Sequence, residues 1–152
     1  MTKEEEDYLQ HRFGSLLNGP DVELFSHGGC HIFAAALHKR FGYPLFIVPG
    51  DGKGVSHVYC RYDGTPPYCV DALGFTREDI RIYDQLVRDY VKPISPEELK
   101  DYQTHIRGPG LFSQPWFYES ALQRAEKRLE THLAYFDGTL KERVPDAIDF
   151  GR

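Results

Sequence analysis

The sequence predicts an α+β fold, and three observations support this prediction. The 152 residues have the usual length of one domain. Apolar residues make up 41% and charged residues 27% of the chain, which is ordinary globular composition. Apolar residues recur at helical spacing towards both ends, and short strand-like runs lie between them. Helices, then a small sheet, then further helices indicate one α+β domain over residues 1–152.

Two helices are predicted in the first part of the chain. The first covers roughly residues 3–17 and ends at the Asn-Gly-Pro sequence that begins at Asn18. A loop then leads to the segment CHIFAAALHKRFG, in which apolar residues follow helical spacing and Gly42 supplies the stop. Cys30 therefore lies in the first turn of a largely buried helix.

Three short strands are predicted after this helix. The apolar run PLFIV at 44–48 is bounded by Pro and Gly, as in a buried strand. Residues 57–62 and 68–71 read as two strands of a hairpin, because the connecting sequence Asp-Gly-Thr-Pro-Pro is rich in turn residues. We expect these strands to form a small antiparallel sheet.

A helical extension is predicted over about 95–137. Ser95 and the following Pro-Glu-Glu match a helix start, and an amphipathic helix covers about 117–136. Before this extension, Thr76 and Asp79 match the capping box of a short helix. From Gly138 onward we expect a poorly determined tail.

The composition disfavours several classes of function. A net charge of −5 disfavours nucleic acid as a partner, because such binding needs a basic surface. No apolar run is long enough to cross a bilayer, and the acidic start lacks the apolar core of a signal peptide. Three cysteines cannot pair completely. We expect a reducing location, either the cytoplasm or a target cell's cytosol reached by specialised secretion.

Cys30 is the first candidate catalytic residue. A helix N-terminus stabilises a thiolate through its unpaired N–H groups and its dipole. Gly28 and Gly29 leave room for a substrate carbonyl and let backbone N–H groups approach an oxyanion. Considered alone, a cysteine after two glycines is more often a small buried structural residue than a catalytic one, so its interpretation depends on partners.

His57 and Asp71 are the expected partners of Cys30. If the hairpin pairs Tyr59 with Cys69, His57 lies directly opposite Asp71. Paired residues on antiparallel strands project from the same face with Cβ atoms roughly 4.5–5.5 Å apart. The carboxylate could then orient the imidazole as a base for the thiol. A surface His–Asp pair is the structural alternative, and a register slip of one residue would separate the two.

This order of residues resembles the papain-like and transglutaminase-like superfamily, in which Cys on a helix is followed by His and Asp or Asn on the next strands. The matching motifs are GGCHIFAAAL at 28–37, SHVYC at 56–60 and YCVDALG at 68–74, about a third of the chain. The resemblance implies a papain-like core and a catalytic triad of Cys30, His57 and Asp71. It implies a thiol hydrolase or acyl transferase acting on an amide, ester or isopeptide bond, with a protein or peptide substrate and no cofactor.

Arylamine N-acetyltransferases have a similar pattern, but they are much longer, so we expect a relation in architecture only. Papain-like enzymes also usually place a Gln before the cysteine as an oxyanion donor, and the matching stretch has none. Besides the Cys30 N–H and Gly29, the weak candidates for this role or for substrate contact are Asn18, His27 and Gln114.

Three alternatives accompany this interpretation. His31 adjoins Cys30 but is rotated about 100° around the helix, so it is expected to pack or to line the substrate rim. A zinc site is disfavoured, because His57 and Cys60 would face opposite sides of their strand. The chain could also be a non-catalytic protein-binding module on the same scaffold, with its acidic surface and C-terminal amphipathic helix suited to a protein partner.

Aromatic residues also gather in the segment GPGLFSQPWFY at 108–118. Such a cluster could form one wall of a substrate groove. Coverage of the core is the favoured interpretation, because large aromatic side chains gain most from burial.

Overall fold

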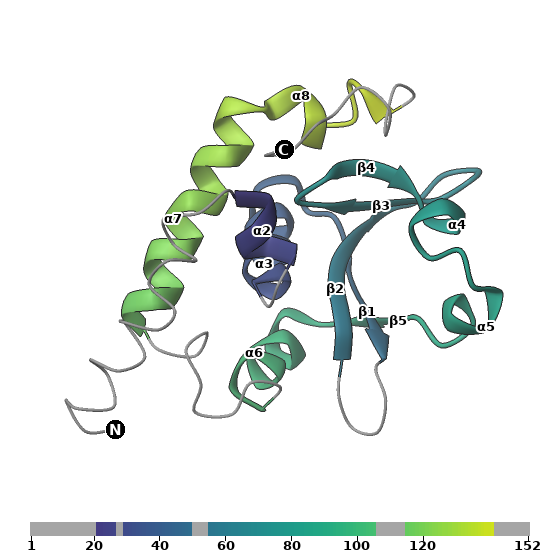
Figure 1. The fold of residues 1–152 in the computed structure, drawn as a ribbon, viewed down its shortest axis with the longest axis horizontal. Coiled ribbons are helices and arrows are strands. Elements are labelled where there is room, and N and C mark those ends of the chain that lie inside the picture. Colours follow the sequence, from purple (N-terminus) through teal and green to yellow (C-terminus); the bar gives the residue numbers. More distant parts are fainter. Residues whose placement is uncertain (1–20, 27–28, 50–54, 106–114, 142–152) are drawn as a thin grey trace.

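A computed structural model describes residues 21–26, 29–49, 55–105 and 115–141, and its centre is one antiparallel sheet (Figure 1). The order of strands across the sheet is β4-β3-β2-β1-β5. In chain order the strands are β1 (Leu45–Pro49), β2 (Val55–Tyr62), β3 (Tyr68–Asp71), β4 (Gly74–Arg77) and β5 (Lys92–Ile94). The predicted α+β class is confirmed.

Helices lie on both sides of this sheet. Figure 1 shows α2, α3 and α7 on one side and the short helices α4 and α5 on the other. In chain order the helices are α2 (Asp21–Ser26), α3 (Cys30–Phe41), α4 (Glu78–Arg81), α5 (Gln85–Arg88), α6 (Pro96–His105), α7 (Pro115–Thr131) and α8 (Leu133–Phe136). The helix predicted over 3–17 lies outside the described residues.

Helix α3 is the central helix of the fold and begins at the residue that the sequence predicted. Ile32, Phe33 and Leu37 are at most 1% exposed, so this helix is buried between the sheet and α7. Its end is set by Gly42, whose φ of 75° is a left-handed conformation that glycine adopts without strain. The Gly42 N–H donates to the carbonyl of His38 and closes the last turn.

The sheet separates two apolar clusters, because side chains alternate between its faces. Towards α3, the main cluster contains Leu45, Ile47, Val58 and Val70. On the opposite face a smaller cluster joins strand residues to the α4–α5 segment, and it consists of Val48, Tyr59, Cys69 and Ile82 with Phe46, Val87 and Val91 packed against it. The segment that carries α4 and α5 is therefore held against the face of the sheet that α3 does not cover.

The helix starts were predicted with mixed success. At α6 the Ser95 hydroxyl accepts from the Glu98 N–H, and the Glu98 carboxylate accepts from the Ser95 N–H, so the predicted start is confirmed as a complete capping box. The box predicted at Thr76 is wrong, because Thr76 lies in β4 and α4 begins at Glu78 without a side-chain cap.

The helix predicted over 117–136 is interrupted in the structure. Helix α7 ends at Thr131, and His132 has a non-helical conformation with φ −122° and ψ 42° before α8 begins. Within the described parts of the chain, no helix is long and apolar enough to cross a membrane.

Candidate active site

The sulfur of Cys30 lies where the ladder between β2 and β3 stops. The last pair of that ladder is Cys60 with Val70, so within the described ranges the preceding part of β2 has an edge with no strand partner on this side. The backbone N–H of Val58 points from this edge and donates to the sulfur, which also has side-chain hydrogen bonds with His57 and His31. The N-terminus of α3 thus docks onto the free edge of the histidine-bearing strand.

His57 and Asp71 are in direct contact. Nε2 of His57 lies 3.1 Å from Oδ2 of Asp71, and the two side chains are 17% and 8% exposed. Because Nε2 faces the carboxylate, Nδ1 is the ring nitrogen left for the thiol. The structure therefore brings all three residues of the expected triad together.

The register that led to this expectation is wrong by two residues. Cys69 pairs with Arg61 and not with Tyr59, so His57 is a diagonal neighbour of Asp71 and not its direct partner. A slip of two residues keeps both side chains on the same face, because the side-chain period of a strand is two. Diagonal neighbours remain within reach of a long side chain such as histidine.

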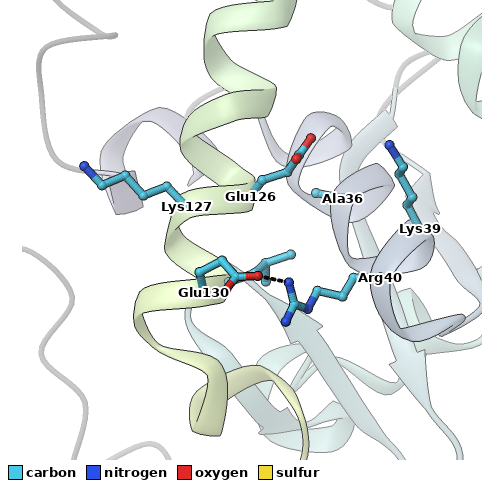
Figure 2. A pocket seen from close by; sticks show the side chains of 7 residues that line it. Ala36, Lys39, Arg40, Glu126, Lys127 and Glu130 are labelled. Carbon is cyan, nitrogen blue, oxygen red and sulfur yellow. Dashed lines mark hydrogen bonds and ion pairs between the residues drawn. The ribbon is translucent and has the colours of Figure 1, made fainter.

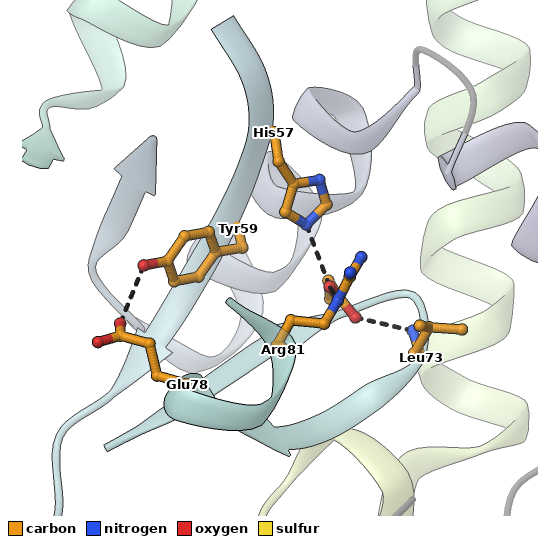
Figure 3. Close-up of polar contacts among 6 residues, drawn as sticks. His57, Tyr59, Leu73, Glu78 and Arg81 are labelled. Atoms are coloured by element: carbon orange, nitrogen blue, oxygen red, sulfur yellow. Dashed lines mark hydrogen bonds and ion pairs between the residues drawn. The ribbon is translucent and has the colours of Figure 1, made fainter. Parts of the chain in front are cut away.

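Asp71 is held by two further donors (Figure 3). Nε of Arg81 lies 3.1 Å from Oδ2, the same oxygen that faces His57. The Leu73 N–H lies 3.0 Å from Oδ1 and closes a local turn. Sequence reasoning missed Arg81, because no local pattern links a residue of α4 to a strand ten positions earlier.

The ring of His57 is also supported from the side. Tyr59 stacks on it with ring centroids 5.9 Å apart and an angle of 16° between the planes. The Tyr59 hydroxyl donates to Oε2 of Glu78 at 2.9 Å, and Glu78 is paired with Arg61 at 3.2 Å (Figure 3). This network fixes Tyr59, which in turn limits the movement of the imidazole.

The contacts change the protonation of the site. Burial would raise the pKa of Cys30, but the hydrogen bonds with His31 and His57 and the charge of His57 lower this pKa to about 5. Burial would lower the pKa of His57, but Asp71 and Cys30 raise it to about 9. Between these values the pair is a thiolate and an imidazolium.

The carboxylate partner keeps its charge. Burial would raise the pKa of Asp71, yet the hydrogen bond and charge of His57, followed by the charge of Arg81, hold it below its usual range. Cys60 and Cys69 behave in the opposite way, because burial raises the pKa of both thiols. Cys30 is thus the activated thiol of the three.

Gly29 does not have the expected oxyanion role, because its N–H already donates to the carbonyl of Leu24 at 3.1 Å. It is a packing residue, since a Cβ on it would lie 2.8 Å from that carbonyl oxygen. Cys30 follows as the first residue of α3, so its N–H has no acceptor inside the helix and is the better donor. Asn18, His27 and Gln114 lie outside the described residues.

The side chain of His31 lies closer to Cys30 than the sequence indicated. Helical spacing predicted a side chain turned away from Cys30, but the structure gives the two side chains a hydrogen bond, and His31 is only 5% exposed. The signal in the sequence was adjacency alone, which is too weak to assign a contact.

A pocket of about 270 Å³ adjoins His57 on the sheet face that α3 does not cover. Its walls come from β1, β2 and the α4–α5 segment. Among the residues around it are Val48, His57, Arg81, Tyr83 and Val87. His57 and Arg81, which line this pocket, are also the two side chains that contact Asp71.

Other hollows lie away from the triad. One of about 350 Å³ lies between α3 and α7, where Arg40 and Glu130 form an ion pair beside Lys39 and Lys127 (Figure 2). Another of about 430 Å³ is lined by residues of α7 and by Asp21. Neither is lined by a triad residue, so neither belongs to this site.

No group of three or more His, Cys, Asp or Glu side chains in the described ranges is arranged to hold a metal ion. Comparisons of the chain with protein-family models, with curated proteins and with solved structures found no match. The chemistry of the site therefore has to be argued from its own geometry.

Proposed function

We propose that the chain is a thiol-dependent hydrolase or acyl transferase with the triad Cys30, His57 and Asp71. The observation that carries the proposal is the continuous contact from the sulfur through the imidazole to the carboxylate. A lowered thiol pKa, a base and an oriented carboxylate are the parts that covalent catalysis by cysteine needs. A substrate with an amide, ester or isopeptide bond fits this chemistry, and a protein or peptide is the expected carrier of that bond.

The reaction takes two steps. The thiolate of Cys30 attacks the carbonyl carbon, and the Cys30 N–H stabilises the oxyanion. The bond to the leaving group then breaks, and the leaving group takes the proton of the His57 imidazolium, which leaves a thioester. Water or an amine next attacks the thioester while His57 accepts its proton, so that the carbon–sulfur bond breaks and the ion pair is restored.

The same arrangement supports a papain-like or transglutaminase-like core. Cysteine at the start of a helix, followed by histidine and aspartate on successive antiparallel strands, is the order that the resemblance implies. A reducing compartment such as the cytosol would keep the Cys30 thiol available for this reaction.

A non-catalytic protein-binding module is the second candidate function. The observation in its favour is a group of exposed apolar side chains on and beside α4 and α5: Ile80, Tyr83, Leu86 and Tyr90, which are 52%, 85%, 70% and 71% exposed. Apolar groups that gather on a surface often mark a binding site.

Acylation of the protein by p-nitrophenyl acetate separates these two functions. We expect acetylation at Cys30, read by mass spectrometry, followed by release of acetate with turnover. Cys30→Ser keeps nearly the same side-chain size and should lose turnover by at least about a hundredfold, because a hydroxyl has no comparable ionised form near pH 7. Acetylation on Cys60 or on lysines at the same rate as on Cys30 would contradict the proposal.

A further inference from the structure

The pocket beside His57 has a largely apolar wall, whereas the cluster of His57, Asp71 and Arg81 behind it is polar. Val48 and Ile82 are 4% and 9% exposed and form its inner part, and Val87 and Tyr83 continue the apolar wall towards solvent. Pockets that bind small groups are usually apolar with a few placed polar atoms. At about 270 Å³ the pocket has room for one large side chain and little more.

The charged side chains around this pocket each have a hydrogen-bond partner within the protein. Arg81 uses Nε for Asp71, and the Asp84 carboxylate accepts from the Leu86 N–H at 2.9 Å, which caps α5. The His57 imidazolium and Arg81 are both held by the Asp71 carboxylate, and Asp84 is a further anion, so the pocket has no strong preference for a charged ligand. Across the described residues, the terminal nitrogens of Arg81 have no hydrogen-bond partner, so they can donate to a carbonyl oxygen.

Because the pocket lies next to His57, the role of His57 in the reaction determines which part of a substrate the pocket binds. In the proposed reaction, His57 gives its proton to the leaving group and later takes one from the acceptor. A pocket lined by His57 therefore lies on the leaving-group and acceptor side of the thioester. The acyl side of the substrate must lie on the other side of the sulfur.

We propose that this pocket is the subsite for the leaving or accepting amine, and that it selects an amine with a large apolar or aromatic side chain and a neighbouring carbonyl. The apolar wall binds the side chain, and Arg81 donates to the carbonyl. In a peptide, this is the residue immediately after the scissile bond. The inference rests on the proposed function and adds the substrate class of its site.

Acceptor partitioning tests the subsite directly. Acetyl-Cys30 is formed with p-nitrophenyl acetate, and equal concentrations of phenylalaninamide, glycinamide and glutamic acid α-amide compete for it, with N-acetyl products measured by mass spectrometry. We expect phenylalaninamide to be acetylated at least about tenfold more than glycinamide, a ratio that burial of a few carbon atoms supplies. The acidic amide should be no better than glycinamide.

Two tyrosines provide a matched pair of variants. Tyr83 is 85% exposed and lines the pocket, whereas Tyr90 is 71% exposed and does not. Tyr83→Ala should reduce the preference for phenylalaninamide to less than about threefold, and Tyr90→Ala should leave it unchanged. Because the preference is a ratio within one variant, the amount of active protein does not affect it.

The outcomes separate the two proposals. Acetyl-Cys30 that reacts equally with all three amides, or best with the acidic one, overturns the subsite and leaves the thiol chemistry intact. An unchanged preference in Tyr83→Ala also overturns the subsite. If acetyl-Cys30 never forms, the proposed function is wrong and the subsite assignment fails with it.

Discussion

The two carboxylate oxygens of Asp71 have different partners. Oδ2 faces both His57 and Arg81, each at 3.1 Å, and Oδ1 accepts from the Leu73 N–H. The turn at Leu73 fixes the direction of the carboxylate, and the arginine maintains its charge. Asp71 is therefore built to hold an imidazolium, which is the state that keeps the Cys30 thiolate at neutral pH.

Replacing this carboxylate should change the pH dependence of Cys30. In Asp71→Asn the pKa of His57 falls, because the hydrogen bond and charge that raise it are lost. The thiolate then loses its imidazolium partner, so the pKa of Cys30 rises. The acid limb of the alkylation rate should move up by at least about one pH unit, which lowers the rate about twofold at pH 6 and nearly tenfold at pH 4.

A surface carboxylate is the control for this change. Asp79 pairs with Arg77 on the exposed side of α4, and Asp79→Asn should leave the profile of Cys30 in place. An Asp71→Asn profile that coincides with that of the unmodified protein would mean that the carboxylate does not act on the thiol.

Between elements, the junction of α2 and α3 places the thiol. Gly29 packs so closely against the backbone of α2 that an added Cβ meets the Leu24 carbonyl oxygen at 2.8 Å. We expect Gly29→Ala to cost about 1–3 kcal/mol of unfolding free energy and to slow alkylation of Cys30, because the start of α3 must shift. Denaturant unfolding and alkylation rates measure the two effects.

Gly42 provides the comparison at the other end of α3. Its φ of 75° makes Gly42→Ala cost about 1–2 kcal/mol, although nothing lies within 4 Å of the added Cβ. The two variants should thus be similarly destabilised, but only Gly29→Ala should slow the alkylation of Cys30. Equal alkylation rates in both would argue against a positioning role of the α2–α3 junction.

Elements with strong local signals were predictable from the sequence. Helix α3 has helical spacing and a terminal glycine, and α6 has the serine cap with its glutamate partner, so both were placed correctly. Strands β4 and β5 have only four and three residues, which is too short for a periodic pattern, and both were missed. Strand β3 is as short as β4, but the turn-rich sequence before it indicated a hairpin.

The residues of the triad were predictable from the sequence, but the contacts around them were not. A period of two put His57 and Asp71 on one face even though the assumed register was wrong. Arg81 and the pocket depend on how the α4–α5 segment packs on the sheet, which is set by contacts far apart in the sequence. Local patterns contain no information on such contacts.

For the whole molecule, helices α7 and α8 share one core with α3. Phe136 of α8 is fully buried, and its ring lies 5.3 Å from that of Phe33 in α3. The Tyr43 hydroxyl donates to the Phe136 carbonyl at 2.8 Å. These contacts predict that α8 and the site fold together.

Removal of the Phe136 ring tests this coupling. We expect Phe136→Ala to destabilise the protein by about 3–5 kcal/mol, as for other buried aromatic residues. Unfolding followed by circular dichroism and by alkylation of the buried Cys60 should give coincident transitions, shifted together by the substitution. Separate transitions for the two signals would show that the chain contains more than one folding unit.

The rate of Cys30 alkylation by iodoacetamide as a function of pH is the most direct test of the ion pair. Modification is assigned to individual cysteines by mass spectrometry, so Cys60 and Cys69 are internal controls. We predict that the rate at Cys30 rises through a pKa of about 5, because the folded site stabilises the thiolate, and changes again near 9, where His57 loses its proton. A single rise near the pKa of an ordinary thiol, about 8.5, would contradict the account.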